Sequence, residues 1–346
     1  MTQDYKRIGT EEAFMTPLVS RMLKKGVEDG SIDDPGFVGM YNLLFAENSV
    51  KLPLLLDLEE GRIPEMDAAG VDMHVLAQTA PGLQIFDRDS AVGAMPEVND
   101  YLADVIGRHP TRFAGLASIA PQDPEASAKE IERARNALNL GGIMVNSHTH
   151  GEWLSDEKFW PILEAAEAND MPIYIHPQTP MPGLRAFTDY GMDMAFHGFA
   201  VEVSTHMLTI ILSGALDRFP KLKFVLGHLG EGLPYWLYRF DYMQYSTDRP
   251  GLKMRPIVHK RELENISDYI RRNIWITTSG MPAPEPIKFA TKQMGEDHIL
   301  YAMDYPYEMD REEVPMTEEG VADTQKKKFW EDNARGLFHI DGPVGA

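Results

Sequence analysis

Short apolar runs that are rich in valine, isoleucine and aromatic residues recur along the chain, and most of them end in polar residues. Runs of this length, bounded by glycine, proline and polar residues, predict buried β-strands. A stretch long enough for at least one helix separates each run from the next. The eight predicted strands cover residues 7–12, 71–79, 113–121, 141–148, 172–177, 223–228, 274–280 and 301–306.

Helical patterns lie between these strands. After the third strand, Asp123 followed by Pro124 predicts a helix start, because an aspartate caps the first free amides and proline suits the first helical position. Ile131 and Ala134 then recur at helical spacing, and a second helix is predicted over residues 155–168. Eight strands that alternate with helices are typical of an α/β protein and predict a (β/α)8 TIM barrel.

Three connections are longer than one helix requires, and they predict insertions after strands 1, 5 and 6. They cover about residues 20–60, 178–215 and 229–273. Connections that follow the strands lie on the catalytic face of such a barrel, so we expect these to shape a pocket or an oligomer contact. No linker argues for a second domain, and a single domain is predicted for residues 1–346.

Composition narrows the classes of function. The formal net charge of −20 would repel nucleic-acid phosphates and anionic membranes, so we expect neither partner. No apolar stretch approaches the roughly 20 residues that a membrane helix needs, and we expect a cytoplasmic enzyme. The chain has no cysteine, which excludes disulfides, zinc–thiolate sites and thiol nucleophiles. Any metal ion would therefore be bound by histidine and carboxylate side chains.

Polar residues follow several of the predicted strands. Side chains at the carboxyl ends of barrel strands converge on one mouth, so these residues are the first candidates for catalysis. Carboxylates and imidazoles are ligands for divalent ions, and those at the ends of strands 1, 5 and 8 would leave coordination positions open for water or substrate. The predicted ligands are Glu11, His176 and Asp304, and His228 after strand 6 is a fourth ligand or a nearby acid or base. The other polar residues at these ends are Glu12, Thr79, Asn146, His148 and Ser279.

Each of these residues also has a structural interpretation. A single histidine after an apolar strand, such as His176, is more often a structural residue than a metal ligand. Asp304 precedes Pro306 and has the pattern of a turn aspartate. The coincidence of several ligand-type residues at one structural position favours the metal site. His148 and His150 have the pattern of residues that line a loop or bond locally, and His197 lies in the second insertion, so we do not predict these three as ligands.

These residues resemble a known family. The histidine of YIHP, the histidine of GHLGE, the aspartate of AMDYP and the acidic strand-1 motif TEEAF resemble the amidohydrolase-2 branch of the amidohydrolase superfamily. Within it, the longer strings GHLGEGLPYWLYRFDYM and YAMDYPY are most similar to the 5-carboxyvanillate decarboxylase subgroup, over about residues 7–338. The resemblance implies non-oxidative decarboxylation of an ortho-hydroxy aromatic acid with one divalent ion, Mn2+ or Zn2+, held by Glu11, His176 and Asp304.

The same resemblance implies roles for further residues. Asp304 would protonate the ring carbon that bears the carboxylate, His228 would assist it or contact the phenolate, and Arg239 would bind a polar group of the substrate. The substrate would also contact Thr79, Phe199 and Tyr307. Related γ-resorcylate and 2,3-dihydroxybenzoate decarboxylases read Glu-Glu-His where this chain reads Glu-Glu-Ala, so the second ligand of strand 1 is missing, as in the 5-carboxyvanillate subgroup. Strand 4 ends without a lysine that could bridge two metals.

Two other functions remain open at this point. The same metal could activate water for a hydrolase of a lactone, ester or amide, or the barrel could be a catalytically silent binding protein. The family also implies a homodimer or homotetramer. Finally, it implies an arginine in the first insertion that binds a dianionic substrate, whereas the best-aligned segment here, residues 45–48, reads FAEN. We therefore expect a substrate with fewer carboxylates unless Lys51 or Arg185 supplies the charge.

Overall fold

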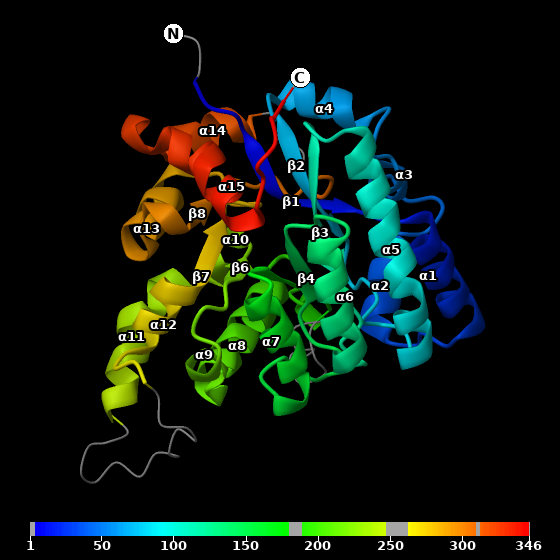
Figure 1. Ribbon diagram of the computed structural model, residues 1–346, viewed down its shortest axis with the longest axis horizontal. Coiled ribbons are helices and arrows are strands. Elements are labelled where there is room, and N and C mark those ends of the chain that lie inside the picture. Colours follow the sequence, from blue (N-terminus) through cyan, green and yellow to red (C-terminus); the bar gives the residue numbers. More distant parts are fainter. Residues whose placement is uncertain (1–3, 180–188, 247–261, 309–311, 346) are drawn as a thin grey trace.

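The computed structural model describes residues 4–179, 189–246, 262–308 and 312–345. Eight parallel strands pair in the order of the sequence, which confirms the predicted (β/α)8 barrel (Figure 1). Beyond β8, the backbone N–H of Thr10 on β1 donates to the carbonyl of Tyr301 at 3.0 Å and joins the first strand to the last. The strands are β1 Ile8–Phe14, β2 Met73–Gln78, β3 Phe113–Ser118, β4 Gly142–Asn146, β5 Ile173–His176, β6 Phe224–Leu226, β7 Ile274–Thr277 and β8 Ile299–Leu300.

Helices surround the barrel and fill its long connections. The four helices α1 to α4 lie between β1 and β2, whereas α8 and α9 lie between β5 and β6. The α-helices are α1 Pro17–Asp29, α2 Pro35–Leu44, α3 Lys51–Leu56, α4 Arg62–Ala69, α5 Arg88–Arg108, α6 Pro124–Asn136, α7 Trp160–Ala168, α8 Gly198–Ser213, α9 Ala215–Arg218, α10 His228–Glu231, α11 Leu233–Ser246, α12 Ile266–Asn273, α13 Pro284–Met294, α14 Glu313–Glu319 and α15 Asn333–Phe338. Three 3-10 helices, Glu157–Phe159, Glu296–His298 and Asp323–Gln325, and a π-helix, Lys328–Asp332, complete the set among the described residues.

The predicted helix start at Asp123 is confirmed. Its side chain accepts from the backbone N–H of Ala126 at 3.0 Å, and Pro124 occupies the first position of α6. The predicted helix over 155–168 begins later, because a 3-10 turn ends at Phe159 before α7 starts.

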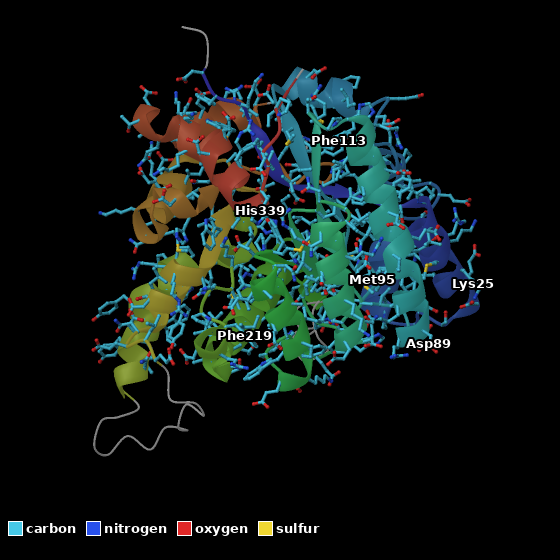
Figure 2. All side chains as sticks on the ribbon, viewed as in Figure 1. Lys25, Asp89, Met95, Phe113, Phe219 and His339 are labelled. Atoms are coloured by element: carbon cyan, nitrogen blue, oxygen red, sulfur yellow. The ribbon has the colours of Figure 1, made fainter. Side chains whose placement is uncertain are left out.

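Two apolar layers hold the barrel together. Side chains that alternate along the strands point into it, and Val75, Tyr174 and Val225 are among those that fill the interior. The opposite faces of the strands pack against the helices, where Phe113 and Met95 are buried (Figure 2). None of the described helices is both long enough and apolar enough to cross a membrane.

The eighth strand differs from its prediction. We expected a strand over residues 301–306, but β8 covers only Ile299–Leu300. The next residues leave the strand ladder, and Asp304 adopts a left-handed backbone with φ of 64°. Asp304 therefore lies on a turn beyond the strand, where β1 still donates from the backbone N–H of Ala13 to the carbonyl of Tyr305 at 2.7 Å but side chains must bind the N–H groups of the turn.

Candidate metal centre and active site

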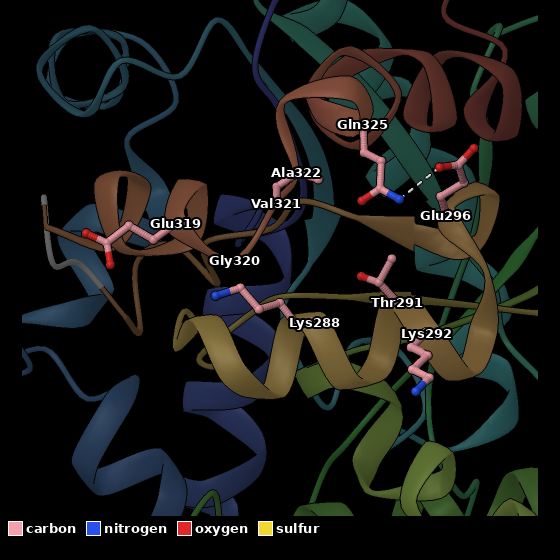
Figure 3. Close-up of a pocket in the computed structure, with 9 residues that line it drawn as sticks. All are labelled: Lys288, Thr291, Lys292, Glu296, Glu319, Gly320, Val321, Ala322 and Gln325. Carbon is pink, nitrogen blue, oxygen red and sulfur yellow. Dashed lines mark hydrogen bonds between the residues drawn. The ribbon is translucent and has the colours of Figure 1, made fainter.

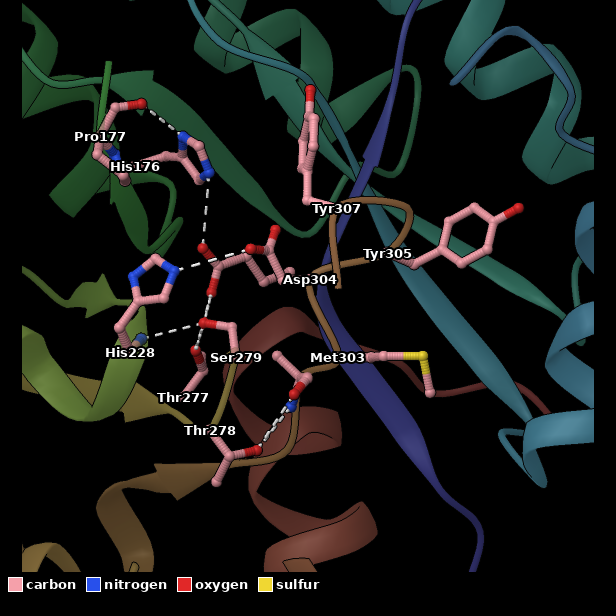
Figure 4. Close-up of polar contacts among 12 residues, drawn as sticks. His176, Pro177, His228, Thr277, Thr278, Ser279, Met303, Asp304, Tyr305 and Tyr307 are labelled. Atoms are coloured by element: carbon pink, nitrogen blue, oxygen red, sulfur yellow. Dashed lines mark hydrogen bonds and ion pairs between the residues drawn. The ribbon is translucent and has the colours of Figure 1, made fainter. Parts of the chain in front are cut away.

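Three ligand-type side chains meet at the mouth of the barrel. Glu11 lies on β1, His176 is the last residue of β5, and Asp304 follows β8. Figure 4 shows His176 and Asp304 with the residues around them. One potential ligand atom from each residue lies within 4.8 Å of the others. Glu11 and Asp304 are buried, and together with Thr79 and Met144 the three residues line a small cavity.

The Glu11 carboxylate is oriented by one of its two oxygens. Oε2 accepts hydrogen bonds from the hydroxyls of Tyr174, Thr277 and Ser279. Oε1 is buried and has no hydrogen-bond partner. The environment therefore fixes one oxygen and leaves the other available as a ligand.

The tautomer of His176 is set by its neighbour. Nδ1 lies 2.7 Å from the carbonyl oxygen of Pro177, which can only accept, so Nδ1 carries the proton. Nε2 is then an unprotonated nitrogen in the neutral ring, and it lies 3.7 Å from Oε1 of Glu11. Histidine ligands in metal sites are oriented by such a bond on the second ring nitrogen.

Asp304 faces His228. Oδ1 of Asp304 is buried without a partner, and Oδ2 lies 3.8 Å from Nε2 of His228. Burial raises the pKa of Asp304 to about 6. Burial lowers the pKa of His228, but the carboxylates of Glu231 and Glu11 outweigh this effect and raise it well above its usual value.

The backbone around His228 is strained. Nδ1 of His228 lies 2.7 Å from the Glu231 carboxylate, three residues ahead. His228, Leu229 and Glu231 all have left-handed backbone angles, with φ between 50° and 54°. This conformation costs about 1–2 kcal/mol for each such residue. It turns the imidazole toward Asp304, and strain of this kind is concentrated at functional sites.

The donor set fits a divalent ion. Two carboxylate oxygens without partners and one unprotonated imidazole nitrogen converge from β1, β5 and the turn after β8. An orphaned buried carboxylate oxygen is costly unless a cation or a proton compensates it. Three protein ligands would also leave positions open for substrate.

The other predicted site residues lie at different depths. The hydroxyls of Thr79, after β2, and Tyr307 form a hydrogen bond, and burial raises the pKa of Tyr307. Phe199 is half-buried in the first turn of α8. Arg239 lies on α11, where its side chain is exposed and makes no hydrogen bond or ion pair with another described residue.

Of the residues that orient the ligands, Ser279 was named from the sequence only as a polar residue at a strand end, and Tyr174, Thr277 and Glu231 were missed. Tyr174 precedes His176 by two positions, and Ser279 follows Thr277 by two, so strand alternation places each pair on one face. That signal was available. Glu231 offered a weaker signal, because its contact with His228 depends on the left-handed turn.

A second buried cluster contains a serine, a glutamate and a histidine. Nε2 of His206 accepts from the backbone N–H of Leu154 at 3.0 Å, so the proton of the neutral ring is on Nδ1, 3.4 Å from the Ser147 hydroxyl. The Ser147 hydroxyl donates to Glu202 at 3.0 Å. Burial lowers the pKa of His206 to about 3. This histidine cannot take a proton from the serine, so the cluster is structural and is not a nucleophilic triad.

A broader hollow lies on the outside of the barrel (Figure 3). Residues on and after α13 and α14 line it, including Lys288, Lys292 and Glu319. Its Glu296 is already bonded to Gln325 at 2.9 Å. None of the predicted site residues lines this hollow, so the small cavity at the mouth is the candidate site.

Comparisons with known proteins show which family and which solved structures the chain resembles. The model of a family described as amidohydrolase matches residues 54–340. Gamma-resorcylate decarboxylase of Polaromonas sp. is 32% identical over 297 residues, which cover 83% of this chain and 89% of the relative. A structure of 5-carboxyvanillate decarboxylase from Novosphingobium aromaticivorans, complexed with manganese and 4-hydroxy-3-methoxy-5-nitrobenzoic acid, is 40% identical with a TM-score of 0.91 and covers 98% of this chain and 97% of its own. The structure of 2,6-dihydroxybenzoate decarboxylase complexed with 2,6-dihydroxybenzoate is 29% identical, with a TM-score of 0.81, and covers 97% of this chain and 99% of its own.

Proposed function

This chain belongs to the amidohydrolase family, and on that premise we propose that it is a metal-dependent, non-oxidative decarboxylase of an ortho-hydroxy aromatic acid. Its relatives of known function are decarboxylases, and the chain is an enzyme of that kind. The observation that carries the proposal is the convergence of Glu11, His176 and Asp304, with two carboxylate oxygens left unpaired.

The metal would be held by Oε1 of Glu11, Nε2 of His176 and Oδ1 of Asp304. We favour Mn2+ over Zn2+, because manganese is present in structures of the similar decarboxylases. When bound, the ion supplies a Lewis acid that orients the carboxylate and the neighbouring hydroxyl of the substrate. An acid that lacks this hydroxyl would lose one of the two orienting oxygens.

Asp304 would supply the proton for the reaction. Its transfer to the ring carbon that bears the carboxylate interrupts the aromatic ring, and the electron pair of the carbon–carbon bond then restores aromaticity as CO2 leaves. The ortho oxygen donates electrons in the first step, so no aryl carbanion forms. A pKa raised to about 6 makes the proton-bearing form of Asp304 accessible near neutral pH in the metal-free protein.

The remaining residues would bind and orient the substrate. His228, held by Glu231, would act on Asp304 or contact the phenolate. Thr79 and Tyr307 present adjoining hydroxyls beside the mouth, and Phe199 would pack against the ring. Arg239 would bind a polar substituent of the substrate. Because its side chain is exposed on α11, this role requires the arginine to come close to the bound substrate.

A product analysis tests the proposal against metal-dependent hydrolysis. The purified protein is assayed for its metal content, and the manganese-loaded enzyme is incubated with a panel of hydroxybenzoic acids, their O-methyl derivatives and aromatic lactones. We expect CO2 release only from the free phenolic acids, with one deuterium on the vacated carbon in D2O. Acid release from the lactones without CO2 release would establish a hydrolase, and label at another carbon would exclude protonation at the carboxyl-bearing carbon.

A further inference from the structure

The turn that carries Asp304 is held on both sides by a single carboxylate. Oε1 of Glu12 accepts from the backbone N–H of Met303 at 3.0 Å, and Oε2 accepts from the backbone N–H of Tyr305 at 3.0 Å. Glu12 itself is fully buried on β1. The backbone N–H groups of the residues before and after Asp304 are thus held by one carboxylate.

The first insertion holds the next part of the same turn. Lys51, the first residue of α3, donates from Nζ to the carbonyl oxygens of Pro306 and Tyr307, the second at 2.9 Å. Each carbonyl therefore faces a cation, and such hydrogen bonds are stronger than those between neutral groups.

A buried arginine lies between Glu12 and the turn of Asp304. Arg62 of α4 is fully buried, its guanidinium lies 4.5 Å from the centre of the Tyr305 ring, and it donates to the carbonyl oxygen of Ala13 at 2.7 Å. It thereby packs against both the turn and the residue that follows Glu12.

The conformation of Asp304 explains why the turn needs this support. Asp304 has a φ of 64°, which residues other than glycine rarely adopt. Because β8 ends at Leu300, strand pairing no longer binds the backbone N–H groups of Met303 and Tyr305. A buried amide without a partner would be costly. A displacement of Met303 or a rotation of the Asp304–Tyr305 peptide group would also turn the Asp304 carboxylate away from the mouth.

We propose that Glu12 and Lys51 are positioning residues that fix the Asp304 carboxylate against the reacting ring carbon. Glu12 would hold the amides before and after Asp304, while Lys51 would hold the two following carbonyls. Neither residue needs to touch the substrate. The catalytic consequence rests on the proposed function, whereas the hold on the backbone does not.

Hydrogen–deuterium exchange on the metal-free protein tests the hold directly. Glu12→Gln keeps the shape of the side chain but replaces one acceptor by an amide donor, so one of the two backbone N–H groups loses its partner. The matched control is Glu331→Gln, which alters another buried carboxylate that accepts from a backbone N–H, that of Lys6 at 2.9 Å. We expect peptides that span residues 301–305 to exchange about tenfold faster or more in Glu12→Gln, and not in Glu331→Gln. Equal exchange in wild type and Glu12→Gln would overturn the proposal.

Steady-state kinetics test the catalytic consequence. In manganese-loaded Glu12→Gln we expect kcat to fall about tenfold or more, since a small misplacement of a reacting group is costly, while KM and manganese content stay near wild type. Lys51→Met should lower kcat in the same direction, and Lys51→Arg should restore it. A merely structural role would lower the folded fraction of both Glu12→Gln and Glu331→Gln without lowering kcat per folded site, and that result would contradict the positioning role.

The exchange experiment and the kinetic experiment together distinguish a failure of this proposal from a failure of the proposed function. If the wild-type enzyme releases no CO2 from any acid, the proposed function fails while the exchange result still decides whether Glu12 holds the turn. If wild type is active and Glu12→Gln has wild-type kcat, the positioning role alone fails. Should Glu12→Gln not fold, Lys51→Met and Lys51→Arg carry the kinetic test, and wild-type kcat in Lys51→Met would overturn it.

Discussion

A β-carbon on Gly227 would lie 2.8 Å from each carboxylate oxygen of Glu11. No real β-carbon approaches so closely, so an alanine there must displace the carboxylate. The φ of Gly227 is −67°, which alanine adopts easily, and the effect would therefore be steric alone. The glycine at the end of β6 is thus part of what shapes the predicted metal site.

We predict that Gly227→Ala lowers the affinity for Mn2+ about 10- to 100-fold, the range seen when residues that orient metal ligands are altered. Calorimetric titration of the metal-free protein measures this. Gly107→Ala is the matched control, because Gly107 lies on α5 with open space where its β-carbon would be. Unchanged manganese affinity in Gly227→Ala would show that Glu11 is not a ligand or that it moves freely.

Asp304→Asn should separate proton transfer from metal binding. Asparagine keeps a carbonyl oxygen that can bind the ion but cannot deliver a proton. We expect kcat to fall by about 10²- to 10⁴-fold, the usual contribution of a general acid, with a smaller loss of manganese affinity. Elemental analysis of the variant must show a full complement of metal before the rates are compared. A metal-loaded variant with near-normal kcat would remove Asp304 from its assigned role.

Much of the fold could be predicted from local patterns. Eight apolar runs of strand length gave the order of the barrel, and a strong cap at Asp123 located α6 within a residue. His176 could be placed at the mouth because it ends β5, whereas Glu11, which was expected at the end of strand 1, lies in the middle of β1, which continues to Phe14. The position of Asp304 was less certain, since the run of residues 301–306 resembles a strand but lies beyond the end of β8.

What the sequence did not reveal depends on long-range contacts. Glu12 follows Glu11 on β1 and lines the same small cavity, but only the structure shows that its carboxylate accepts from the turn of Asp304. Residues 45–48 were compared with the substrate-binding segment of the family, and within them Glu47 is exposed and forms an ion pair with Lys24 of α1 at 2.5 Å. Charges in a long insertion cannot be assigned to a pocket from their sequence alone.

The buried His206 predicts a loss of stability in acid. Burial lowers its pKa to about 3 in the folded protein, whereas in the unfolded chain it would protonate near its ordinary pKa of 6.5. The unfolded state therefore binds more protons between these values, and the free energy of unfolding should fall by a few kcal/mol as the pH falls from about 6.5 toward 3. Denaturant unfolding of wild type and His206→Gln at several pH values tests this. If the free energy of unfolding changed equally with pH in the two proteins, His206 would make no contribution to the loss of stability in acid.

The cations of the first insertion bear on the substrate. Lys24 and Lys25 pair with carboxylates, and Lys51 is committed to two carbonyls. Arg62 is buried beneath the turn, and Arg21 is exposed on α1. None of these five cations of residues 15–72, all of which the structure describes, lines the small cavity at the mouth.

We therefore predict that the enzyme prefers a phenolic acid with one carboxylate over 5-carboxyvanillate. A second carboxylate in a partly desolvated pocket without a bidentate cation costs free energy that a charge-assisted pair would otherwise supply. Steady-state comparison of 5-carboxyvanillate with salicylate-type and dihydroxybenzoate acids, on one manganese-loaded preparation, measures the difference. Arg185 lies outside the described residues, and Arg185→Gln shows whether it supplies the missing charge. A kcat/KM for 5-carboxyvanillate of about 10⁶ M⁻¹s⁻¹ or more, retained in Arg185→Gln, would show that this chain binds the second carboxylate without Arg185 and without an arginine in the first insertion. The predicted preference for one carboxylate would then be wrong.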